Sequence, residues 1–322
     1  MIPLRDTVRA GNYPVVNNII IGVNVLVFLF QLSLGVEGNR FVYIFGLVPA
    51  RYSNPQISVY FSIPYQLFSF LSFMFLHGGF WHLLGNMWSL YIFGDNVEDR
   101  LGHLRYLAFY LICGCASGIS HLLLNLNSNV PTIGASGAIA GVMGAYFILY
   151  PRSKILTLIP IFFIPYFLEI PAYFFLGFWF ILQFLSATGS PSEVSGVAWW
   201  AHIGGFVFGI LFLRVLLALP SAGPSKAARR ISARRKTPHL QVIRPVGPGL
   251  DPHLYGTIYI TAHEAAAGTS KLINIPWGFH KRLFRLAVPP GIQAGHTLRL
   301  RGLGKQYAAG ERGDLYLKVR IV

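Results

Sequence analysis

Long apolar blocks fill the first two thirds of the chain, and short polar stretches separate them. A helix that crosses a bilayer needs about 20 mostly apolar residues, with a range of about 17–25. Six blocks meet or approach this length, so we expect six membrane-spanning helices. Their approximate bounds are 15–34, 80–95, 105–125, 133–150, 171–187 and 197–219.

Two stretches between the blocks do not fit this pattern. Residues 35–79 are semi-apolar and contain three prolines, so we expect a long loop there. Residues 155–170 are apolar but carry two prolines and Glu169. We expect this second segment to lie at the membrane interface or to lead irregularly into the fifth span.

The last part of the chain changes its period. Apolar and polar side chains alternate in short runs, with Gly- and Pro-rich turns between them, and this pattern is typical of strands. The runs are 254–261, 270–275, 297–301 and 315–321. The predicted fold class is therefore an all-α polytopic membrane protein with a six-helix bundle at 1–219. A linker at 220–252 and a small all-β, sandwich-like cytoplasmic domain at 253–322 follow it.

Composition and charge support this division. The chain is 54% hydrophobic and 11% charged, against about 25% charged residues in soluble domains. The net charge of +15 is divided as +2 over residues 1–219 and +13 over residues 220–322. Loops rich in Lys and Arg alternate with poorer loops, which predicts that both termini are cytoplasmic. We expect a multi-pass protein of the bacterial inner (plasma) membrane.

The basic linker and the two cysteines indicate which partners and cofactors to expect. The Lys/Arg cluster at 226–236 is interpreted as a topology signal that also touches anionic lipid. No aromatic side chains are interleaved with it, so nucleic acid is not expected as a partner. Cys113 and Cys115 lie two apart inside an apolar block and form neither a disulfide nor a metal pattern. We expect no cofactor and no metal.

Four polar residues inside the apolar blocks are candidates for chemistry. Polar groups in a membrane span are costly and are usually paired or functional. His82, Ser136 and His202 each lie about three to six residues into a span that starts on the predicted outer side. They should therefore reach one common depth, and Asn86 shares a helix face with His82, one turn deeper.

Small residues would let these helices approach closely. Gly137 and Gly141 are spaced Gly-x-x-x-Gly, as are Gly205 and Gly209. These residues would also serve packing alone, and that alternative stays open. If the polar groups meet, His202 would activate the Ser136 hydroxyl as a nucleophile. No Asp or Glu lies at matching depth in these spans, which favours a Ser-His dyad over a triad.

These residues carry a resemblance to a known family. The motifs Gly134-Ala135-Ser136-Gly137, His82-x-x-x-Asn86 and Ala201-His202-x-x-Gly205-x-x-x-Gly209 resemble the signatures of rhomboid intramembrane serine proteases, over about residues 15–219. The resemblance implies a six-helix core that cleaves transmembrane segments of substrates near their outer ends, with the fifth span gating entry. It implies that Ser136 is the nucleophile and His202 the base.

The resemblance also implies supporting residues and shows one departure. His82, Asn86 and the Ser136 amide would stabilise an oxyanion, with Gly134 as a supporting residue of the same motif. Some members carry an aromatic residue four positions after the serine, stacked on the histidine. That position is Ala140 here, so the sequence leaves open what orients His202.

Three other histidines are given no catalytic role. His77 matches a histidine that stabilises a loop in this family. His103 and His121 have no matching role, so we expect both to be structural or interfacial.

The tail resembles another family. Residues 254–322, with motifs such as Pro289-Pro290-Gly291 and Arg312-Gly313-Asp314-Leu315, are similar to one C-terminal β-sandwich repeat of DnaJ-type co-chaperones. The tail has no His-Pro-Asp tripeptide and no Cys-x-x-Cys-x-Gly cluster. Stimulation of a chaperone ATPase is therefore not expected. The resemblance implies an edge for an extended peptide or a chaperone-related partner, although a solubilising appendage is the alternative.

Two functions are compatible with these patterns. The first is a serine endopeptidase that cleaves transmembrane protein substrates within the bilayer. The second is a non-catalytic membrane scaffold that binds transmembrane clients and recruits cytoplasmic partners through its tail. The presence of both Ser136 and His202 favours the first, because a scaffold needs neither.

Overall fold

The structure is a computed structural model. It describes the chain except residues 9, 162–163, 190–195, 220–231, 233–236, 244, 248–250, 278–279 and 307–311. The chain forms two compact units, Met1–Ser232 and Ala233–Val322. The predicted basic cluster at 226–236 falls almost wholly outside the described residues.

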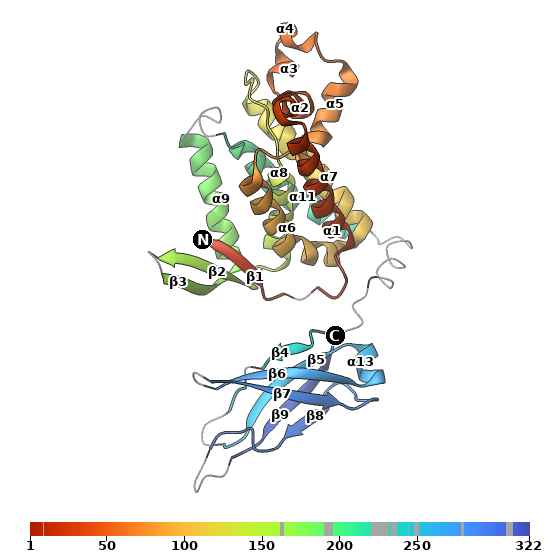
Figure 1. Cartoon of the computed structure of the whole chain (residues 1–322), viewed down its shortest axis with the longest axis vertical. Helices are drawn as coiled ribbons and strands as arrows, with labels where there is room; N and C mark the ends of the chain where they lie inside the picture. Colours follow the sequence, from red (N-terminus) through yellow and green to blue (C-terminus); the bar gives the residue numbers. More distant parts are fainter. Residues whose placement is uncertain are drawn as a thin grey trace. The chain divides into compact units, whose positions relative to one another are not determined.

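The first unit is a helical bundle (Figure 1). Its helices are α1 (Val15–Ser33), α2 (Gly38–Phe45), α3 (Ala50–Ser53), α4 (Pro55–Ser58), α5 (Ile63–Ser72), α6 (Phe80–Leu101), α7 (His103–Leu124), α8 (Ser136–Leu149), α9 (Ala172–Gly189) and α11 (Trp199–Ala218). Single 3₁₀ turns, η1 (Gly35–Glu37) and η2 (Phe73–Phe75), join α1 to α2 and α5 to α6. The predicted long loop at 35–79 is therefore largely helical.

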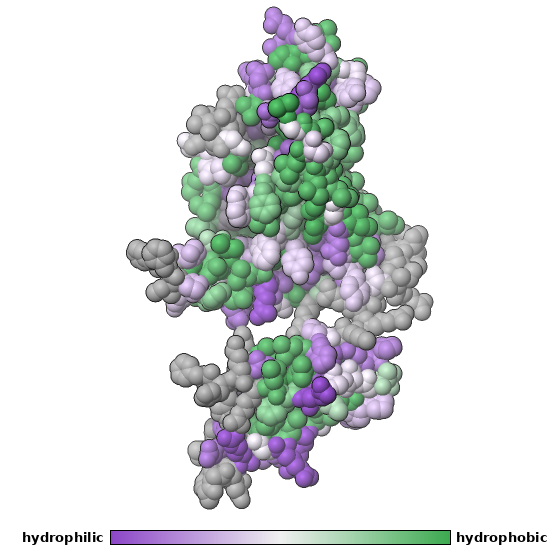
Figure 2. Space-filling model, viewed as in Figure 1, coloured by the Kyte–Doolittle hydropathy of each residue, from purple (hydrophilic) through white to green (hydrophobic). Residues whose placement is uncertain are grey.

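Among the residues that the structure describes, four helices are long and apolar enough to cross a membrane, namely α1, α7, α9 and α11. The α5–η2 segment and α6 pass the same test as a pair but are bent by 80° relative to each other. Figure 2 shows apolar residues over the middle of the viewed face of this unit. Helix α1 exposes large apolar side chains such as Leu26 and Leu29. The chain is a multi-pass membrane protein.

The predicted count of six spans stays a prediction, because two blocks differ from a simple span. Helix α6 carries Asp95, Glu98 and Asp99 near its C-terminal end. Helix α8 has only 14 residues, a length of about 21 Å against a hydrocarbon core of about 30 Å. Residues 137–146 of α8 are all buried, so neighbouring helices surround it rather than lipid.

Glycines explain how α8 can lie so deep in the bundle. A Cβ atom on Gly205 would stand 2.0 Å from the Gly137 carbonyl oxygen, and one on Gly209 would stand 2.3 Å from that of Gly141. Helices α8 and α11 therefore touch backbone to backbone, as small-x-x-x-small patterns permit. The predicted close approach of these two helices is confirmed.

The segment at 155–170 differs from its prediction and adds a sheet to the unit that we expected to be all-α. Strands β2 (Lys154–Ile161) and β3 (Ile164–Pro171) form an antiparallel hairpin, and β1 (Ile2–Asp6) pairs antiparallel with β2. The sheet order is β1-β2-β3. The expectation of an irregular segment was wrong, because the partner strand that completes the sheet lies about 150 residues away in sequence. Its place at the membrane interface stays a prediction.

Acidic residues of α6 hold the chain segment that leads into α1. Asp99 accepts hydrogen bonds from the backbone N–H groups of Gly11 and Asn12. Glu98 accepts from the N–H groups of Val16 and Asn17, at 2.9 and 2.7 Å. The first turn of a helix has free N–H donors and favours negative charge, so these carboxylates fix the start of α1 against the end of α6.

Asp6, at the end of β1, is bound in the same region. Its Oδ2 accepts hydrogen bonds from the Tyr146 hydroxyl of α8 and from Asn96 Nδ2 of α6. Burial raises the pKa of this carboxyl group to about 6, although the hydrogen bond from Tyr146 acts in the opposite direction. Attachment of β1 to the bundle therefore involves a group that titrates near neutrality.

The second unit contains two three-stranded sheets, ordered β4-β6-β7 and β5-β9-β8. The elements are β4 (Leu240–Val242), β5 (Leu254–Ile260), α13 (Ala262–Ala267), β6 (Thr269–Trp277), β7 (His280–Val288), β8 (Thr297–Leu300) and β9 (Leu315–Ile321). Residues 240–242, which were predicted to belong to the linker, pair with β6. Apolar residues from both sheets share one buried cluster, and the predicted sandwich itself stays a prediction.

A buried ion pair lies at the start of α13. Thr261 and Glu264 form a capping box, and Glu264 also pairs with Lys271 of β6. Burial disfavours the Glu264 carboxylate, but hydrogen bonds from Lys271, Thr261 and Thr237 outweigh burial and hold its pKa below the ordinary value. A buried charge is tolerated when it is paired and bonded in this way.

Candidate active site

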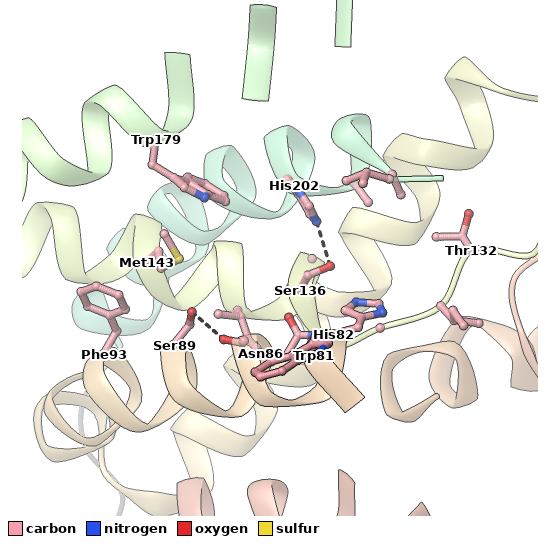
Figure 3. A pocket seen from close by; sticks show the side chains of 18 of the residues that line it. Trp81, His82, Asn86, Ser89, Phe93, Thr132, Ser136, Met143, Trp179 and His202 are labelled. Atoms are coloured by element: carbon pink, nitrogen blue, oxygen red, sulfur yellow. Dashed lines mark hydrogen bonds between the residues drawn. The ribbon is translucent and has the colours of Figure 1, made fainter. Parts of the chain in front are cut away.

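The N-terminal ends of α6, α8 and α11 meet beside one cavity of about 600 Å³. The five candidate residues predicted from the sequence all line it, and Figure 3 labels all of them except Gly134. They are His82, Asn86, Gly134, Ser136 and His202. His82, Ser136 and His202 are the third, first and fourth residues of their helices. These positions are consistent with the predicted common depth.

Ser136 and His202 contact each other directly. Ser136 Oγ lies 2.8 Å from His202 Nε2, and the bond joins the first residue of α8 to the first turn of α11. The residue before Ser136 is Ala135, which offers no side-chain cap to the helix. The first N–H groups of α8 therefore have no intrahelical partner, and they lie beside the serine oxygen.

The second nitrogen of His202 has a partner that was not predicted from the sequence. Nδ1 lies 2.7 Å from Oε1 of Gln183, a residue of α9. An amide oxygen can only accept, so Nδ1 carries the proton and Nε2 accepts from the Ser136 hydroxyl. This tautomer is the one in which His202 can act as a base.

Gln183 is itself held in place. Only 7% of it is exposed, and its Nε2 donates to the Trp179 carbonyl oxygen one turn earlier at 3.4 Å. The signal that could have found it is the same one that identified His82, namely a polar side chain inside an apolar block. The apolar block that contains Gln183 includes neither Ser136 nor a histidine, so no neighbouring motif marks Gln183 as a candidate.

Ring contacts to His202 come from tryptophans. Trp179 of α9 and Trp199 of α11 place their ring centroids 6.0 and 6.1 Å from that of His202. Ala140 is fully buried and faces the backbone of Gly205, where an added Cβ would approach it to 3.3 Å. The close crossing of α8 and α11 therefore favours a small residue at position 140.

His82 presents a donor to the cavity. Its Nδ1 accepts a hydrogen bond of 3.3 Å from the backbone N–H of Gly78. In neutral imidazole the other nitrogen then carries the proton, so the His82 Nε2–H group is free to donate. That nitrogen is the atom nearest to the position of a Cβ on Gly134.

Asn86 provides a second donor one turn along α6. Its Nδ2 is buried and has no hydrogen-bond partner among the described residues. Unsatisfied buried amides are rare and call for an explanation. A negative oxygen in the cavity would supply the missing acceptor.

Position 134 requires a glycine. Its φ is +121°, in a region that other residues rarely adopt. A Cβ there would stand 2.8 Å from His82 Nε2. The Gly134 N–H donates to the Phe73 carbonyl oxygen at 2.9 Å, which ties the turn before Ser136 to the segment before α6.

The other histidines lie outside this cavity. His77 is fully buried and contacts His82 edge-on, with 5.1 Å between ring centroids. Gln31 of α1 binds its backbone N–H and carbonyl group. His121 bonds Asn125, and His103 bonds Glu98 and Ser232. The predicted structural role of these three histidines stays a prediction.

The cavity continues away from Ser136 between α6 and α9. Its walls there are largely apolar and include Phe93, Met143, Phe175 and Trp179. Pro3 of β1 lines its far end, where its carbonyl oxygen accepts a hydrogen bond of 2.6 Å from Trp88 Nε1. Within the described ranges, no three His, Cys, Asp or Glu side chains gather as metal ligands.

Comparisons with known proteins found family models that match parts of both units of the chain. A family model described as the rhomboid domain matches residues 64–219, and one described as the DnaJ C terminal domain matches residues 250–322. These matches confirm both predicted resemblances.

Several curated relatives match the membrane unit. Rhomboid protein 1, mitochondrial, of Saccharomyces cerevisiae is 30% identical over 203 residues, which is 60% of this chain and 51% of that protein. RHOMBOID-like protein 6, mitochondrial, of Arabidopsis thaliana is 34% identical over 47% of this chain and 44% of its own length. Rhomboid protease GluP of Bacillus subtilis is 33% identical over 46% of this chain and 25% of its own length. The match thus spans about half the length of these relatives or less.

Proposed function

Because the chain contains a rhomboid domain followed by a DnaJ C-terminal domain, we propose that it is an intramembrane serine endopeptidase. It cleaves transmembrane segments of protein substrates by a Ser136–His202 dyad. The observation that carries this proposal is the 2.8 Å contact between Ser136 Oγ and His202 Nε2. A relative that is named a rhomboid protease adds support.

The reaction follows from the protonation states at the dyad. Ser136 Oγ attacks the carbonyl carbon of the scissile peptide bond while His202 Nε2 takes the hydroxyl proton. The imidazolium then gives this proton to the leaving amine nitrogen as the C–N bond breaks. A water molecule, activated by the same nitrogen, hydrolyses the acyl-enzyme and regenerates the serine.

Three donors are available for the oxyanion that forms in each step. They are His82 Nε2–H, Asn86 Nδ2–H and the free N–H groups at the start of α8. Donors placed where charge develops are usually the largest single contribution to catalysis. Because the Asn86 amide is unpaired among the described residues, its bond would form with the oxyanion and favour the transition state over the resting state.

The shape of the cavity supports a transmembrane substrate. Its polar groups cluster at the ends of α6, α8 and α11, and its apolar walls continue between α6 and α9. An apolar helix could lie along these walls with its end unwound at Ser136. With both termini cytoplasmic, as the charge pattern indicates, cleavage occurs near the outer end of the substrate segment.

The tail carries a second, weaker proposal. Each sheet of the second unit has strands with only one neighbour, such as β4 and β7. Such edges can accept an extended peptide, so the tail would bind a cytoplasmic segment of a substrate or a partner protein. The scaffold function, in which the whole chain binds clients without cleaving them, is the alternative that the experiment must exclude.

Labelling of Ser136 distinguishes a protease from a scaffold. The native protein in membranes is treated with a fluorophosphonate probe and compared with Ser136→Ala and His202→Ala. We expect labelling of the native protein alone, together with cleavage of a transmembrane substrate that both variants lack. Cleavage by Ser136→Ala at the native rate would rule out the proposed mechanism, and an unlabelled, inactive native protein would favour the scaffold.

A further inference from the structure

His202 is held by one hydrogen bond at each of its ring nitrogens. Ser136 of α8 binds Nε2, and Gln183 of α9 binds Nδ1. The imidazole thus bridges two helices that otherwise contribute different parts of the cavity wall. Loss of the contact at Nδ1 would free the ring to rotate and to exchange its tautomer.

We propose that Gln183 is the positioning residue of the base. It fixes the tautomer and the ring orientation of His202 and so makes α9 part of the catalytic arrangement. This inference rests on the proposed protease function and deepens it. It answers the question that Ala140 leaves open, namely what orients the histidine.

An uncharged acceptor suits this position. Gln183 is buried in a membrane unit, where an isolated carboxylate would carry a large desolvation cost. The Oε1 dipole accepts the Nδ1–H bond in both the neutral and the protonated states of the ring. It therefore stabilises the imidazolium that forms when Ser136 is deprotonated, without placing a permanent charge beside the substrate.

The position of Gln183 on α9 links the base to this helix. Four residues of α9 are buried, namely Ala172, Phe175, Leu176 and Gln183. The residues that follow Gln183 immediately, Phe184 and Leu185, are exposed by 49 and 59%. Gln183 is therefore the last buried contact of a helix that packs through a narrow stripe. A displacement of α9 would remove the acceptor from Nδ1.

The chain between α9 and α11 contains one alternative to Gln183 as the partner of His202 Nδ1. Glu193 lies between α9 and α11 in the sequence and falls outside the described residues. A carboxylate from that connection would be the usual partner of a catalytic histidine. The experiment must therefore compare the two residues directly.

The test measures turnover and labelling in membranes for Gln183→Leu, Gln183→Met, Gln183→Glu and Glu193→Gln. Leu and Met remove the acceptor, and we expect kcat and the rate of fluorophosphonate labelling to fall by about 10- to 100-fold with KM nearly unchanged. Glu keeps an acceptor oxygen but adds the cost of burying a carboxyl group, so its activity should lie between that of the native protein and those of the Leu and Met variants. Glu193→Gln should behave as the native protein.

A double variant distinguishes the positioning of His202 from general damage to the fold. If Gln183 acts through His202, Gln183→Leu should not lower further the residual cleavage that His202→Ala retains at high protein concentration, because the two residues work as a unit. Thr188→Val, at an exposed polar position of α9, serves as the control for changes in that helix. Thermal unfolding of each variant shows whether it is folded.

The outcomes distinguish this inference from the function on which it rests. If Ser136→Ala and His202→Ala are inactive while folded Gln183→Leu and Gln183→Met turn over normally, the inference is overturned and the protease function stands. A loss in Glu193→Gln with normal Gln183 variants would transfer the role to Glu193. If Ser136→Ala keeps native activity, the proposed function fails first.

Discussion

Gly134 shows how tightly single residues are constrained at this site. Its backbone has a positive φ, and its missing side chain leaves the space that the His82 ring occupies. The same residue therefore serves both the turn into α8 and the position of a proposed oxyanion donor.

We expect Gly134→Ala to lower activity strongly. The added Cβ is strained at φ +121° and would push against His82 Nε2, with a backbone cost of about 1–3 kcal/mol. Cleavage and probe labelling should both fall by at least about tenfold. The matched control is Gly35→Ala, where φ is +53° and nothing lies within 4 Å. It should bear a similar strain without a loss of labelling, and equal losses in both variants would argue against a role for His82.

Among single residues, those that could be predicted from the sequence are the ones whose chemistry is unusual for their surroundings. Ser136, His82, Asn86 and His202 are polar groups in apolar blocks, and the structure brings them to one cavity. Gln183 obeys the same rule but was overlooked, since no motif accompanies it. The tautomer of His82 depends on the backbone of Gly78, which no pattern of side chains reveals.

Among the elements, the crossing of α8 and α11 determines whether the dyad can form. Both partners of the Ser136–His202 bond lie at the start of these helices, close to the contact of Gly137 with Gly205. Any side chain at this contact must separate the two helices.

We expect Gly205→Ala to inactivate the protein and to lower its thermal stability. The new Cβ would stand 2.0 Å from the Gly137 carbonyl oxygen, so the helices must move apart and the serine and histidine separate. Gly22→Ala, in α1 with nothing within 4 Å, should instead stabilise the helix by about 0.5–1 kcal/mol. Normal turnover in folded Gly205→Ala would contradict the proposed geometry.

The attachment of β1 should depend on pH. The folded-state pKa of Asp6 is raised to about 6 from 3.8, so its contribution to stability is fully present below about pH 4. That contribution is lost as the pH rises through about 6. Hydrogen exchange of residues 2–6, corrected for its intrinsic pH dependence, should show weaker protection at pH 7.5 than at pH 5.

Asp6→Asn is the control for this effect. The amide cannot ionise, so protection of β1 in this variant should no longer change between these two pH values. An unchanged pH dependence in the variant would rule out Asp6 as the source of the effect.

The elements illustrate why the sequence predicted some parts and not others. Long apolar blocks predicted α1, α7, α9 and α11 because period and length act locally. The hairpin β2–β3 was missed because residues 155–170 are apolar on both faces and show no alternation. Its sheet is completed by β1, and such pairing at long range leaves no local signal.

The whole molecule divides where the charge pattern changes. The first unit has its own apolar core, and the second has another. The described residues that line the site cavity belong to the first unit. The shift from net +2 to net +13 after residue 219 predicted two parts in different solvents. The structure divides the chain into Met1–Ser232 and Ala233–Val322, and the different solvents stay a prediction.

Removal of the tail should therefore leave the catalytic chemistry unchanged, provided that one contact made by Ser232 is kept. Ser232 accepts a hydrogen bond from Tyr13 N–H, and its Oγ lies 2.7 Å from His103 Nε2. A chain that ends after Ser232 should cleave a short transmembrane substrate at the native rate. A chain that ends at Leu219 loses this contact and should be less stable.

Substrates with a cytoplasmic segment give the contrasting measurement. If the tail binds such segments, truncation after Ser232 should slow their cleavage but not that of the short substrate. Equal rates for both substrates would leave the tail with a solubilising role alone.

The backbone contact between α8 and α11 also bears on drug resistance. An inhibitor that reacts with Ser136 would be positioned by a frame in which four glycines leave no side chains to vary. Escape by substitution at Gly137, Gly141, Gly205 or Gly209 would also remove the proposed activity. Resistance should instead accumulate along the walls contributed by α6 and α9, so compounds that make few contacts there would be the most durable.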